Sequence, residues 1–255
     1  MGLATGLLDL VFSPRCLGCG RPAGAAVGAG AAGAGERLIC GRCRSRLTPP
    51  PPPLCDRCGY PRLRTGRRPG PTCPECQEWP VGLRAARSAF LLRDPAASLV
   101  HQLKYRGWKA LAGPMARWMA MVPLPTDVGA EARLVVPVPT TAVRLRERGY
   151  NQAEVLASAL AETTGRTLLR GLVREGGGSS QTTLQPAARL ANVAGAFRPM
   201  AEPQVRLDGE HLLLVDDVLT TGATVIACVQ SLVSAGARCV SVLTFARATG
   251  RLRLI

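Results

Sequence analysis

One segment of the chain restricts its fold more than any other: residues 211–224, an apolar run that leads into two carboxylates and a turn rich in threonine and glycine. His211 to Val215 contains four consecutive apolar residues and predicts a buried strand. Gly222 to Ala235 predicts a helix that ends at Gly236. A strand that passes directly into a helix is typical of units built around a parallel sheet. We therefore predict an α/β fold for the C-terminal two thirds of the chain.

The turn between this strand and helix carries the chemistry. Asp216 and Asp217 stand where the predicted strand ends, the edge at which open parallel sheets bind ligands. Two adjacent carboxylates repel each other, which is tolerable if they accept hydrogen bonds from ligand hydroxyls or act through a cation. The residues after them offer helix N-terminal N–H groups and three hydroxyls to an anion: Thr220, Thr221, Gly222, Ala223 and Thr224. An acidic turn with an ordinary helix cap is the alternative for a few of these residues alone; the whole string indicates ribose hydroxyls beside a phosphate.

Flanking segments predict the rest of the sheet. Leu134–Val138, Thr167–Val173 and Val240–Phe245 are expected strands. Asn151–Thr164 is an expected helix that Asn151 caps, with Glu154 three residues on and Gly165 at its end. The expected buried side chains of the two helices are Val155, Leu156, Ala159 and Leu160 in the first, and Val225, Ile226, Val229, Leu232 and Val233 in the second.

Eight of the ten cysteines form four Cys-x-x-Cys pairs in the N-terminal third: Cys16/Cys19, Cys40/Cys43, Cys55/Cys58 and Cys73/Cys76. Two residues between thiolates let both sulfurs reach one ion, and two such pairs complete a tetrahedral Cys₄ zinc site. Disulfides are the alternative, but the chain shows no secretory signal, so we expect zinc. Spacing does not settle which pairs share an ion, and sequential pairing is our expectation. The two remaining cysteines, Cys228 and Cys239, stand among apolar residues and are expected to be buried and inert.

The predicted organisation has two domains. Residues 1–83 form a double zinc ribbon domain with a short N-terminal helix over Met1 to Phe12, and residues 84–255 form the α/β domain. Five prolines, Pro49 to Pro53, predict a stiff spacer between the ribbons. The zinc is expected to be structural, because folding and metal binding are coupled in so small a core.

Charge and hydropathy limit the partners and the location. The 32 Lys and Arg residues against 17 Asp and Glu residues leave a formal net charge of +15, which favours polyanions such as nucleic acid, although part of the charge could serve solubility alone. No run of about 18 uncharged apolar residues exists, so we predict no membrane span. The N-terminus lacks the features of a signal peptide, and we predict a cytoplasmic protein.

The whole pattern resembles a known family. Leu212 to Thr224 fits the phosphoribosyl pyrophosphate fingerprint of type I phosphoribosyltransferases at every position. The chain as a whole resembles the competence-associated ComF family, which is amidophosphoribosyltransferase-like. The matching pieces are the four cysteine pairs, Leu103-Lys104-Tyr105-Arg106-Gly107, Val136-Pro137-Val138-Pro139, Arg148-Gly149-Tyr150-Asn151-Gln152, and Gln181 with Arg189 and Asn192.

The resemblance implies roles for particular residues. Asp216 and Asp217 would hold the ribose 2′- and 3′-hydroxyls, and Thr220 to Thr224 would bind the 5′-phosphate. The loop after Val138 would face pyrophosphate, with Arg148 as the preferred cation over Arg144 and Arg146. The segment from Gly176 to Gln181 corresponds to a mobile loop in related enzymes. The implied chemistry is a Mg²⁺-assisted displacement of pyrophosphate from ribose C1. No general base stands out over residues 84–125, and both histidines, His101 and His211, are expected to be structural.

Two functions follow from this pattern, and a third is weaker. The first is a phosphoribosyltransferase that binds phosphoribosyl pyrophosphate or a ribose 5-phosphate moiety and acts in DNA uptake during natural transformation. The second is a non-catalytic module that holds single-stranded DNA or a nucleotide, with bases stacked on Tyr60, Trp79, Tyr105 or Trp108. The third is a purely regulatory site. The resemblance also implies a DNA-translocating helicase as a partner.

Overall fold

The computed structural model describes residues 15–23, 37–62, 73–175, 196–200 and 207–250. Its centre is a five-stranded, fully parallel sheet in the order β1-β7-β6-β2-β3. The strands are β1 (Leu83–Leu91), β2 (Leu134–Pro137), β3 (Thr167–Leu168), β6 (His211–Leu219) and β7 (Cys239–Arg247). A separate antiparallel pair joins β4 (Leu172–Arg174) to β5 (Phe197–Pro199).

Helices cover both faces of the sheet, which explains why its central strands are almost continuously apolar. One face carries α3 (Ala96–Tyr105), α4 (Ala112–Ala120) and α7 (Gln152–Thr164), and the other carries α9 (Ala223–Ser234). The shorter helices are α2 (Gly41–Ser45), η2 (Lys109–Leu111), α5 (Thr126–Glu131) and α6 (Ala142–Arg148).

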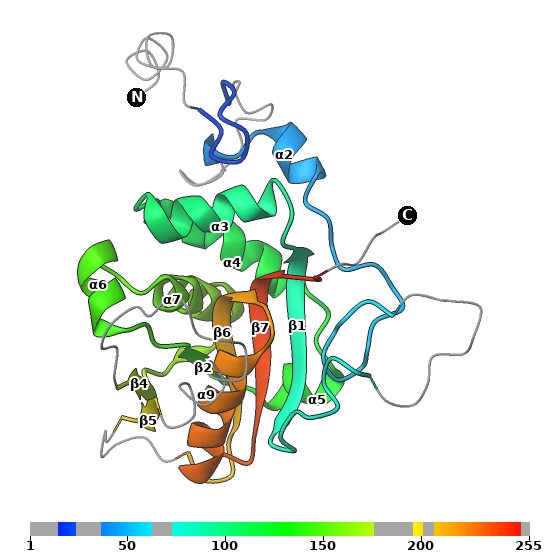
Figure 1. Cartoon of the computed structure of the whole chain (residues 1–255), viewed down its shortest axis with the longest axis vertical. Coiled ribbons are helices and arrows are strands. Elements are labelled where there is room, and N and C mark those ends of the chain that lie inside the picture. The colour runs from blue at the N-terminus through cyan, green and yellow to red at the C-terminus, as the bar shows by residue number, and fades with distance from the viewer. Residues whose placement is uncertain (1–14, 24–36, 63–72, 176–195, 201–206, 251–255) are drawn as a thin grey trace.

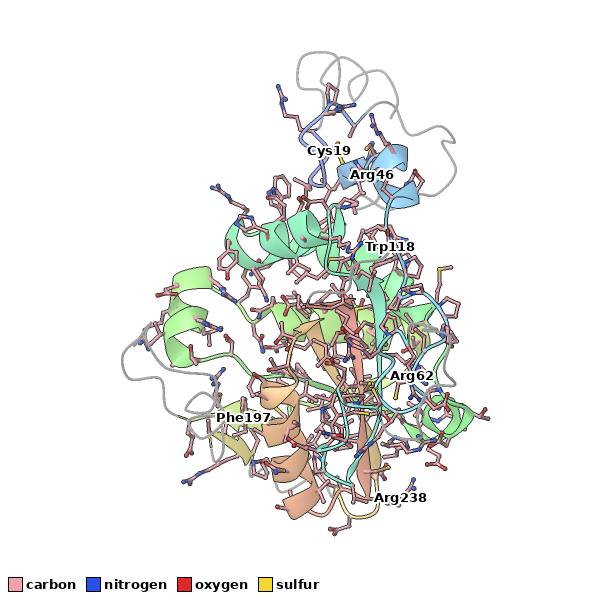
Figure 2. The ribbon with its side chains drawn as sticks, turned by 45° about the vertical axis from the view of Figure 1, so that its right-hand side comes forward. Cys19, Arg46, Arg62, Trp118, Phe197 and Arg238 are labelled. Atoms are coloured by element: carbon pink, nitrogen blue, oxygen red, sulfur yellow. The ribbon has the colours of Figure 1, made fainter. Side chains whose placement is uncertain are left out.

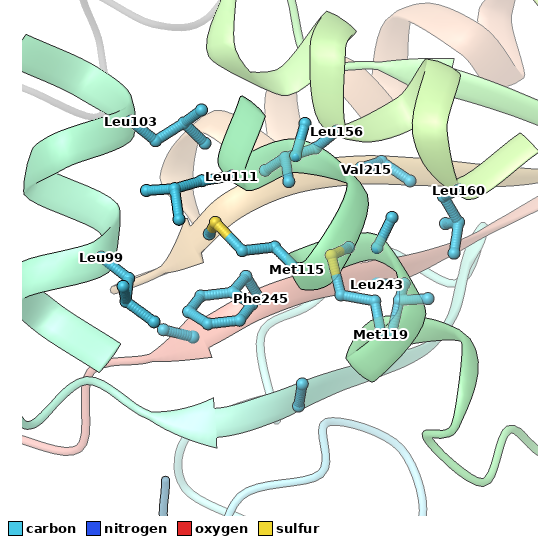
Figure 3. Packing of buried hydrophobic residues seen from close by; sticks show 14 of the residues in the cluster. Leu99, Leu103, Leu111, Met115, Met119, Leu156, Leu160, Val215, Leu243 and Phe245 are labelled. Atoms are coloured by element: carbon cyan, nitrogen blue, oxygen red, sulfur yellow. The ribbon is translucent and has the colours of Figure 1, made fainter. Parts of the chain in front are cut away.

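Strand alternation divides the core into two clusters. Leu213 and Val215 of β6 face the α3, α4 and α7 side, where they join Leu99, Met115 and Leu156 (Figure 3). Leu212 and Leu214 face the other side and pack with Val225, Val229 and Leu232 of α9. The central strand is therefore held from both sides, and its end is a rigid position for functional groups.

The prediction for the helix over Asn151–Thr164 is confirmed at both ends. The Asn151 side chain accepts a hydrogen bond from the amide of Ala153 at 3.1 Å, and Gly165 ends the helix in a left-handed conformation. Glu154 takes no part in the cap, because it pairs with Arg170 at 2.6 Å. The buried face is also rotated from the prediction, since Ala153, Ala157 and Ala161 are buried whereas Val155 and Ala159 are only half-buried. Small residues allow this helix to lie close to the sheet.

Other elements differ from the predictions in their limits. The expected strand over Thr167–Val173 is wrong: β3 and β4 are separate strands in different sheets, because the chain leaves the main sheet after Leu168. The strand that begins at His211 extends to Leu219 rather than ending before the carboxylates. Val233 of α9 is exposed and Ile226 half-buried, whereas Ala227 and Cys228 are buried. Cys239 is half-buried, so only Cys228 fits the expectation of a buried cysteine.

Both cysteine-rich units lie against the α/β unit. The first lies above α3 at one end of the molecule, where Figure 2 shows Cys19 and Arg46 far from Phe197 and Arg238. The second lies beside β1, which begins at Leu83, the last residue of the predicted ribbon domain. The predicted N-terminal helix and the predicted mobile loop, together with Gln181, Arg189 and Asn192, lie outside the described residues.

Candidate ribose-phosphate pocket and zinc centres

The two carboxylates lie where β6 extends beyond the end of the neighbouring strand β2. β2 pairs with β6 only as far as Pro137 opposite Val215, so Asp216 and Asp217 stand beyond the end of β2. Asp217 is 2% exposed and forms an ion pair with Lys104, whose Nζ lies 2.7 Å from Oδ2. The amide of Asp217 donates to Oδ1 of Asp216 at 2.8 Å. The strand thus presents both carboxylates at the open edge of the sheet.

Burial and the neighbouring Asp217 carboxylate raise the pKa of Asp216 well above its ordinary value, and the Lys104 ammonium only partly offsets this effect. Buried carboxylates held this close together gain from ligand hydroxyls or from a cation. The electrostatics therefore suit a site that is completed by a ligand.

The turn after the carboxylates has the geometry of an anion site. Gly222 adopts φ +85, a left-handed conformation that favours glycine, and it precedes the first residue of α9. No side chain caps this helix, so its first backbone N–H groups are available to a ligand. The indole of Trp79, from the second ribbon, lies against Gly222, about 3.6 Å from the place a Cβ would occupy. The ribbon thereby supports the turn directly.

A cavity of about 470 Å³ joins these features. Asp216, Asp217, Thr220 and Thr224 line it from β6 and the turn after it, whereas Thr221, Gly222 and Ala223 belong to the same turn but are not on its wall. The rest of the wall comes from α3, α6, α7, β4, β6 and the loops after β1 and β2: Leu92, Ala97, Val100, His101, Lys104, Tyr105, Val138, Pro139, Thr140, Arg144, Gln152, Arg174 and Val218.

The cations around the cavity differ from the sequence prediction. Arg144 lines the cavity, on a helix whose start is capped by Thr141 at 3.2 Å. Arg148 lies one step behind the wall: its guanidinium donates to Gln152 at 2.9 Å and lies 4.8 Å from the centre of the Tyr105 ring. Arg148 therefore positions two residues of the wall in this structure, whereas Arg144 is exposed to the cavity.

Sequence reasoning missed two cations of the wall as site residues: Lys104 and Arg174. Lys104 belongs to a motif that carries the family resemblance, which was the available signal. Burial lowers the pKa of Arg174, with a further contribution from Arg144. Its Nε is buried without a hydrogen-bond partner among the described residues. A buried guanidinium of this kind favours an anionic ligand.

The two histidines have different environments. His211 is buried, with Nδ1 3.2 Å from Glu131 and Nε2 2.9 Å from Ser241, which fits a structural role. His101 is exposed on α3, lines the cavity, and its ring lies 5.1 Å from that of Tyr105. The role of His101 therefore stays a prediction.

The eight paired cysteines form two clusters in sequential order. In each cluster the four sulfurs lie within 4.8 Å of one another: Cys16, Cys19, Cys40 and Cys43, then Cys55, Cys58, Cys73 and Cys76. The recorded sulfur–sulfur separations of 3.7–3.9 Å are too long for disulfide bonds. They agree with the separation of about 3.8 Å across a tetrahedral ion that has Zn–S bonds of about 2.3 Å. Four thiolates in this arrangement fit structural zinc.

Comparison with known proteins agrees with this organisation. Residues 7–77 match the double zinc ribbon domain, and residues 132–253 match the phosphoribosyl transferase domain. The chain is 30% identical over 209 residues to DNA utilization protein YhgH of Salmonella typhimurium, covering 80% of this chain and 86% of that protein. The corresponding protein of Escherichia coli K12 is 28% identical over 208 residues, covering 80% and 88%.

A third relative carries a different name. Competence protein ComFC of Bacillus subtilis is 26% identical over 210 residues, covering 79% of this chain and 80% of that protein. Among the described residues, no helix is both long enough and apolar enough to cross a membrane.

Proposed function

The chain belongs to the ComF family of proteins with a double zinc ribbon and a phosphoribosyl transferase domain, and on that premise we propose that its cavity binds phosphoribosyl pyrophosphate or a ribose 5-phosphate moiety. One observation carries the proposal. A single cavity of about 470 Å³ combines two partly or fully buried carboxylates with two threonines at an uncapped helix N-terminus. Ribose diols and a 5′-phosphate need those two groups at one site.

The proposed roles follow from chemistry. Asp216 and Asp217 accept hydrogen bonds from the 2′- and 3′-hydroxyls, and the turn from Thr220 to Thr224 donates to the 5′-phosphate. Arg144 and Arg174 neutralise the pyrophosphate, while Arg148 holds Gln152 and Tyr105 in place. Bound Mg²⁺ would neutralise part of the pyrophosphate charge and assist its departure from C1. If the phosphoribosyl group is transferred to an acceptor, the protein is a phosphoribosyltransferase. The described residues contain no evident general base that would activate the acceptor.

The test is a calorimetric titration of zinc-replete protein with phosphoribosyl pyrophosphate, with and without Mg²⁺. We expect binding that ribose 5-phosphate competes away, and loss of binding in the double variant Asp216→Asn with Asp217→Asn. The matched control is Asp127→Asn, which removes an exposed carboxylate paired with Arg84 at 2.7 Å. No heat and no competition with the wild-type protein would refute the proposal. Release of pyrophosphate with candidate acceptors then separates a transferase from a binding module.

A second function has its own observation: exposed aromatic rings beside the cavity. Tyr105 is 60% exposed and Trp108 41% exposed, whereas Trp79 is buried and Tyr60 half-buried. A second, open cavity of about 740 Å³ lies between α3 and the first ribbon, and it shares His101 with the ribose-phosphate cavity. Trp108 lines this second cavity. Single-stranded DNA stacks its bases on such rings.

This second function also fits the names of the relatives, from which we propose a role in DNA uptake. A labelled single-stranded oligonucleotide at low salt tests it: the double variant Tyr105→Ala with Trp108→Ala should bind at least ~10-fold more weakly, since stacking contributes about 1–3 kcal/mol per base. Absence of binding by the wild-type protein would eliminate this function. A helicase partner and a cytoplasmic location stay predictions from the sequence.

A further inference from the structure

The cavity contains a cation that belongs to the chain itself. Lys104 lies in the last turn of α3, and its ammonium reaches across to Asp217 with an Nζ–Oδ2 distance of 2.7 Å. The Lys104 side chain is 22% exposed and that of Asp217 is 2% exposed, so the pair is largely removed from water. Ion pairs this far from water are screened little, and each partner depends on the other for compensation of its charge.

Lys104 is unusual within this sequence. The chain has only two lysines, Lys104 and Lys109, because arginine supplies nearly all of its positive charge. Unlike a guanidinium, an ammonium is a compact point charge with three donors that are not confined to a plane. It resembles a small hydrated cation in the way it can serve several oxygens at once. The position beside a carboxylate pair is one that a divalent cation would otherwise suit.

Of the charged groups near the two carboxylates, Lys104 is the cation that contacts one of them. Among the residues that the structure describes, the acidic residues on the cavity wall are Asp216 and Asp217, and the guanidinium groups there belong to Arg144 and Arg174. Of these three cations, Lys104 alone has a recorded ion pair with either carboxylate. The carboxylate pair is thus partly neutralised before any ligand or metal arrives.

We propose that Lys104 is a positioning residue that takes the place of a divalent cation at the ribose end of the cavity, so that ribose 5-phosphate binds without Mg²⁺. The proposal rests on the proposed function, because it assumes that the carboxylates bind ribose hydroxyls. Lys104 pairs with Oδ2 of Asp217 and fixes the direction of that carboxylate, which leaves its other oxygen and the Asp216 carboxylate for the hydroxyls. Mg²⁺ is then required only when the ligand also carries pyrophosphate.

The experiment measures ribose 5-phosphate affinity by calorimetry in buffer freed of divalent metal before the protein is added, and again with Mg²⁺. No chelator is used, so that the zinc remains in place. The variants are Lys104→Met, which keeps the apolar stem without the charge, and Lys104→Arg, which keeps the charge. Lys109→Met is the matched control, because Lys109 lies 4.6 Å from the Tyr150 ring centre and off the cavity wall. Zinc content and thermal unfolding establish that each variant is folded.

We expect the wild-type affinity to change by less than about twofold when Mg²⁺ is added. Lys104→Met should lose roughly tenfold or more without Mg²⁺, because Asp217 loses the partner of its buried charge, and should regain part of it with Mg²⁺. Lys104→Arg should lose less than Lys104→Met, because it keeps the charge but not the compact ammonium. Lys109→Met should stay near wild type.

Two results would overturn the inference. The first is that the wild-type protein binds ribose 5-phosphate only when Mg²⁺ is present. The second is that, without Mg²⁺, Lys104→Met binds ribose 5-phosphate with wild-type affinity. The first result is measured on the wild-type protein, so it is informative even if a variant does not fold. A wild-type protein that binds neither ribose 5-phosphate nor phosphoribosyl pyrophosphate under any condition would instead refute the proposed function itself.

Discussion

The two zinc ribbons have the same ligand set and differ in how far they are embedded. In the first ribbon Cys19 is exposed and Cys40 half-buried, whereas all four cysteines of the second ribbon are buried. The first ribbon lies over the start of α3, where Gly18 approaches the side chain of Pro95. The second ribbon shares one apolar cluster with the sheet and α9. Both ribbons contribute to a core cluster, since Cys16, Ile39 and Cys43 of the first belong to the cluster of α3 and α4, but only the second ribbon has all four metal ligands buried.

The second ribbon is also fixed by polar contacts that have no counterpart in the described part of the first. Arg57 donates to four backbone carbonyls, those of Leu83, Cys76, Trp79 and Pro80. From the opposite direction, the buried Arg247 of β7 donates to the carbonyl of Cys58 at 2.6 Å. These bonds fasten the ribbon to β1 and β7, the two strands at that edge of the sheet.

Charge separates the ribbons further. The described residues of the first ribbon include six exposed arginines and no acidic residue: Arg15, Arg21, Arg37, Arg42, Arg44 and Arg46. Residues 54–62 and 73–79 of the second contain two arginines against Asp56, Glu75 and Glu78. The comparison teaches that one metal motif can serve two purposes: the second ribbon supports the turn at Gly222, and the first carries a basic surface next to α3.

The largest expected effect separates the two metal sites. Cys58→Ser should abolish cooperative folding of the whole chain, because structural zinc contributes on the order of 10 kcal/mol to folding and Cys58 lies in the shared core. Cys19→Ser, at an exposed ligand, should leave the α/β unit folded. Metal analysis with thermal unfolding measures both. Equal loss of stability in the two variants would contradict the comparison.

The two tryptophans beside the ribbons should differ next. Trp79→Ala removes a buried ring that lies against Gly222 and should lower the free energy of unfolding by about 3–5 kcal/mol. It should also weaken ribose 5-phosphate binding, because the turn loses its support. Trp108→Ala, beside the first ribbon, is the control, since that ring is 41% exposed. Denaturant unfolding and calorimetry check both effects. Unchanged ribose 5-phosphate affinity in Trp79→Ala would show that the second ribbon does not support binding in the pocket.

Arg57→Ala tests the polar attachment of the second ribbon. We expect a loss of about 2–4 kcal/mol in the free energy of unfolding, because four carbonyls lose a charged donor. Arg42→Ala in the first ribbon changes an exposed arginine and should stay within about 0.5 kcal/mol of wild type. Urea titrations of both variants make the measurement. A small effect of Arg57→Ala would mean that apolar packing alone holds the ribbon.

The smallest expected effect concerns nucleic acid. If the basic first ribbon contacts single-stranded DNA, Arg42→Ala with Arg46→Ala should reduce the salt dependence of binding by about 0.7 per lost phosphate contact. Arg238→Ala is the control, because Arg238 lies at the opposite end of the molecule (Figure 2). Oligonucleotide titrations at several salt concentrations give the slopes. An equal change in all variants would assign the effect to net charge and not to the ribbon.

Patterns that are local in the chain were predicted well. The β6 strand, the Asn151 cap and the Gly165 stop all depend on neighbouring residues, so sequence alone indicates them. β1 was missed because Arg84, Arg87 and Ser88 interrupt its apolar residues. Those side chains find partners only after folding: Arg84 pairs with Asp127, and Ser88 lies 2.6 Å from Thr244.

For the site, the sequence by itself indicated the candidate ligand groups: the adjacent carboxylates, the threonine-rich turn and the four cysteine pairs, because the members of each group are close along the chain. Tertiary structure decided what surrounds them. It placed Lys104 beside Asp217, which lies 113 positions further along the chain (217 − 104). It exposed Arg144 and Arg174 to the cavity, and it buried all four cysteines in only one of two similar ribbons. Spacing indicates which neighbouring residues can bind together, whereas the grouping of the cysteine pairs, burial and long-range pairing depend on how the chain packs.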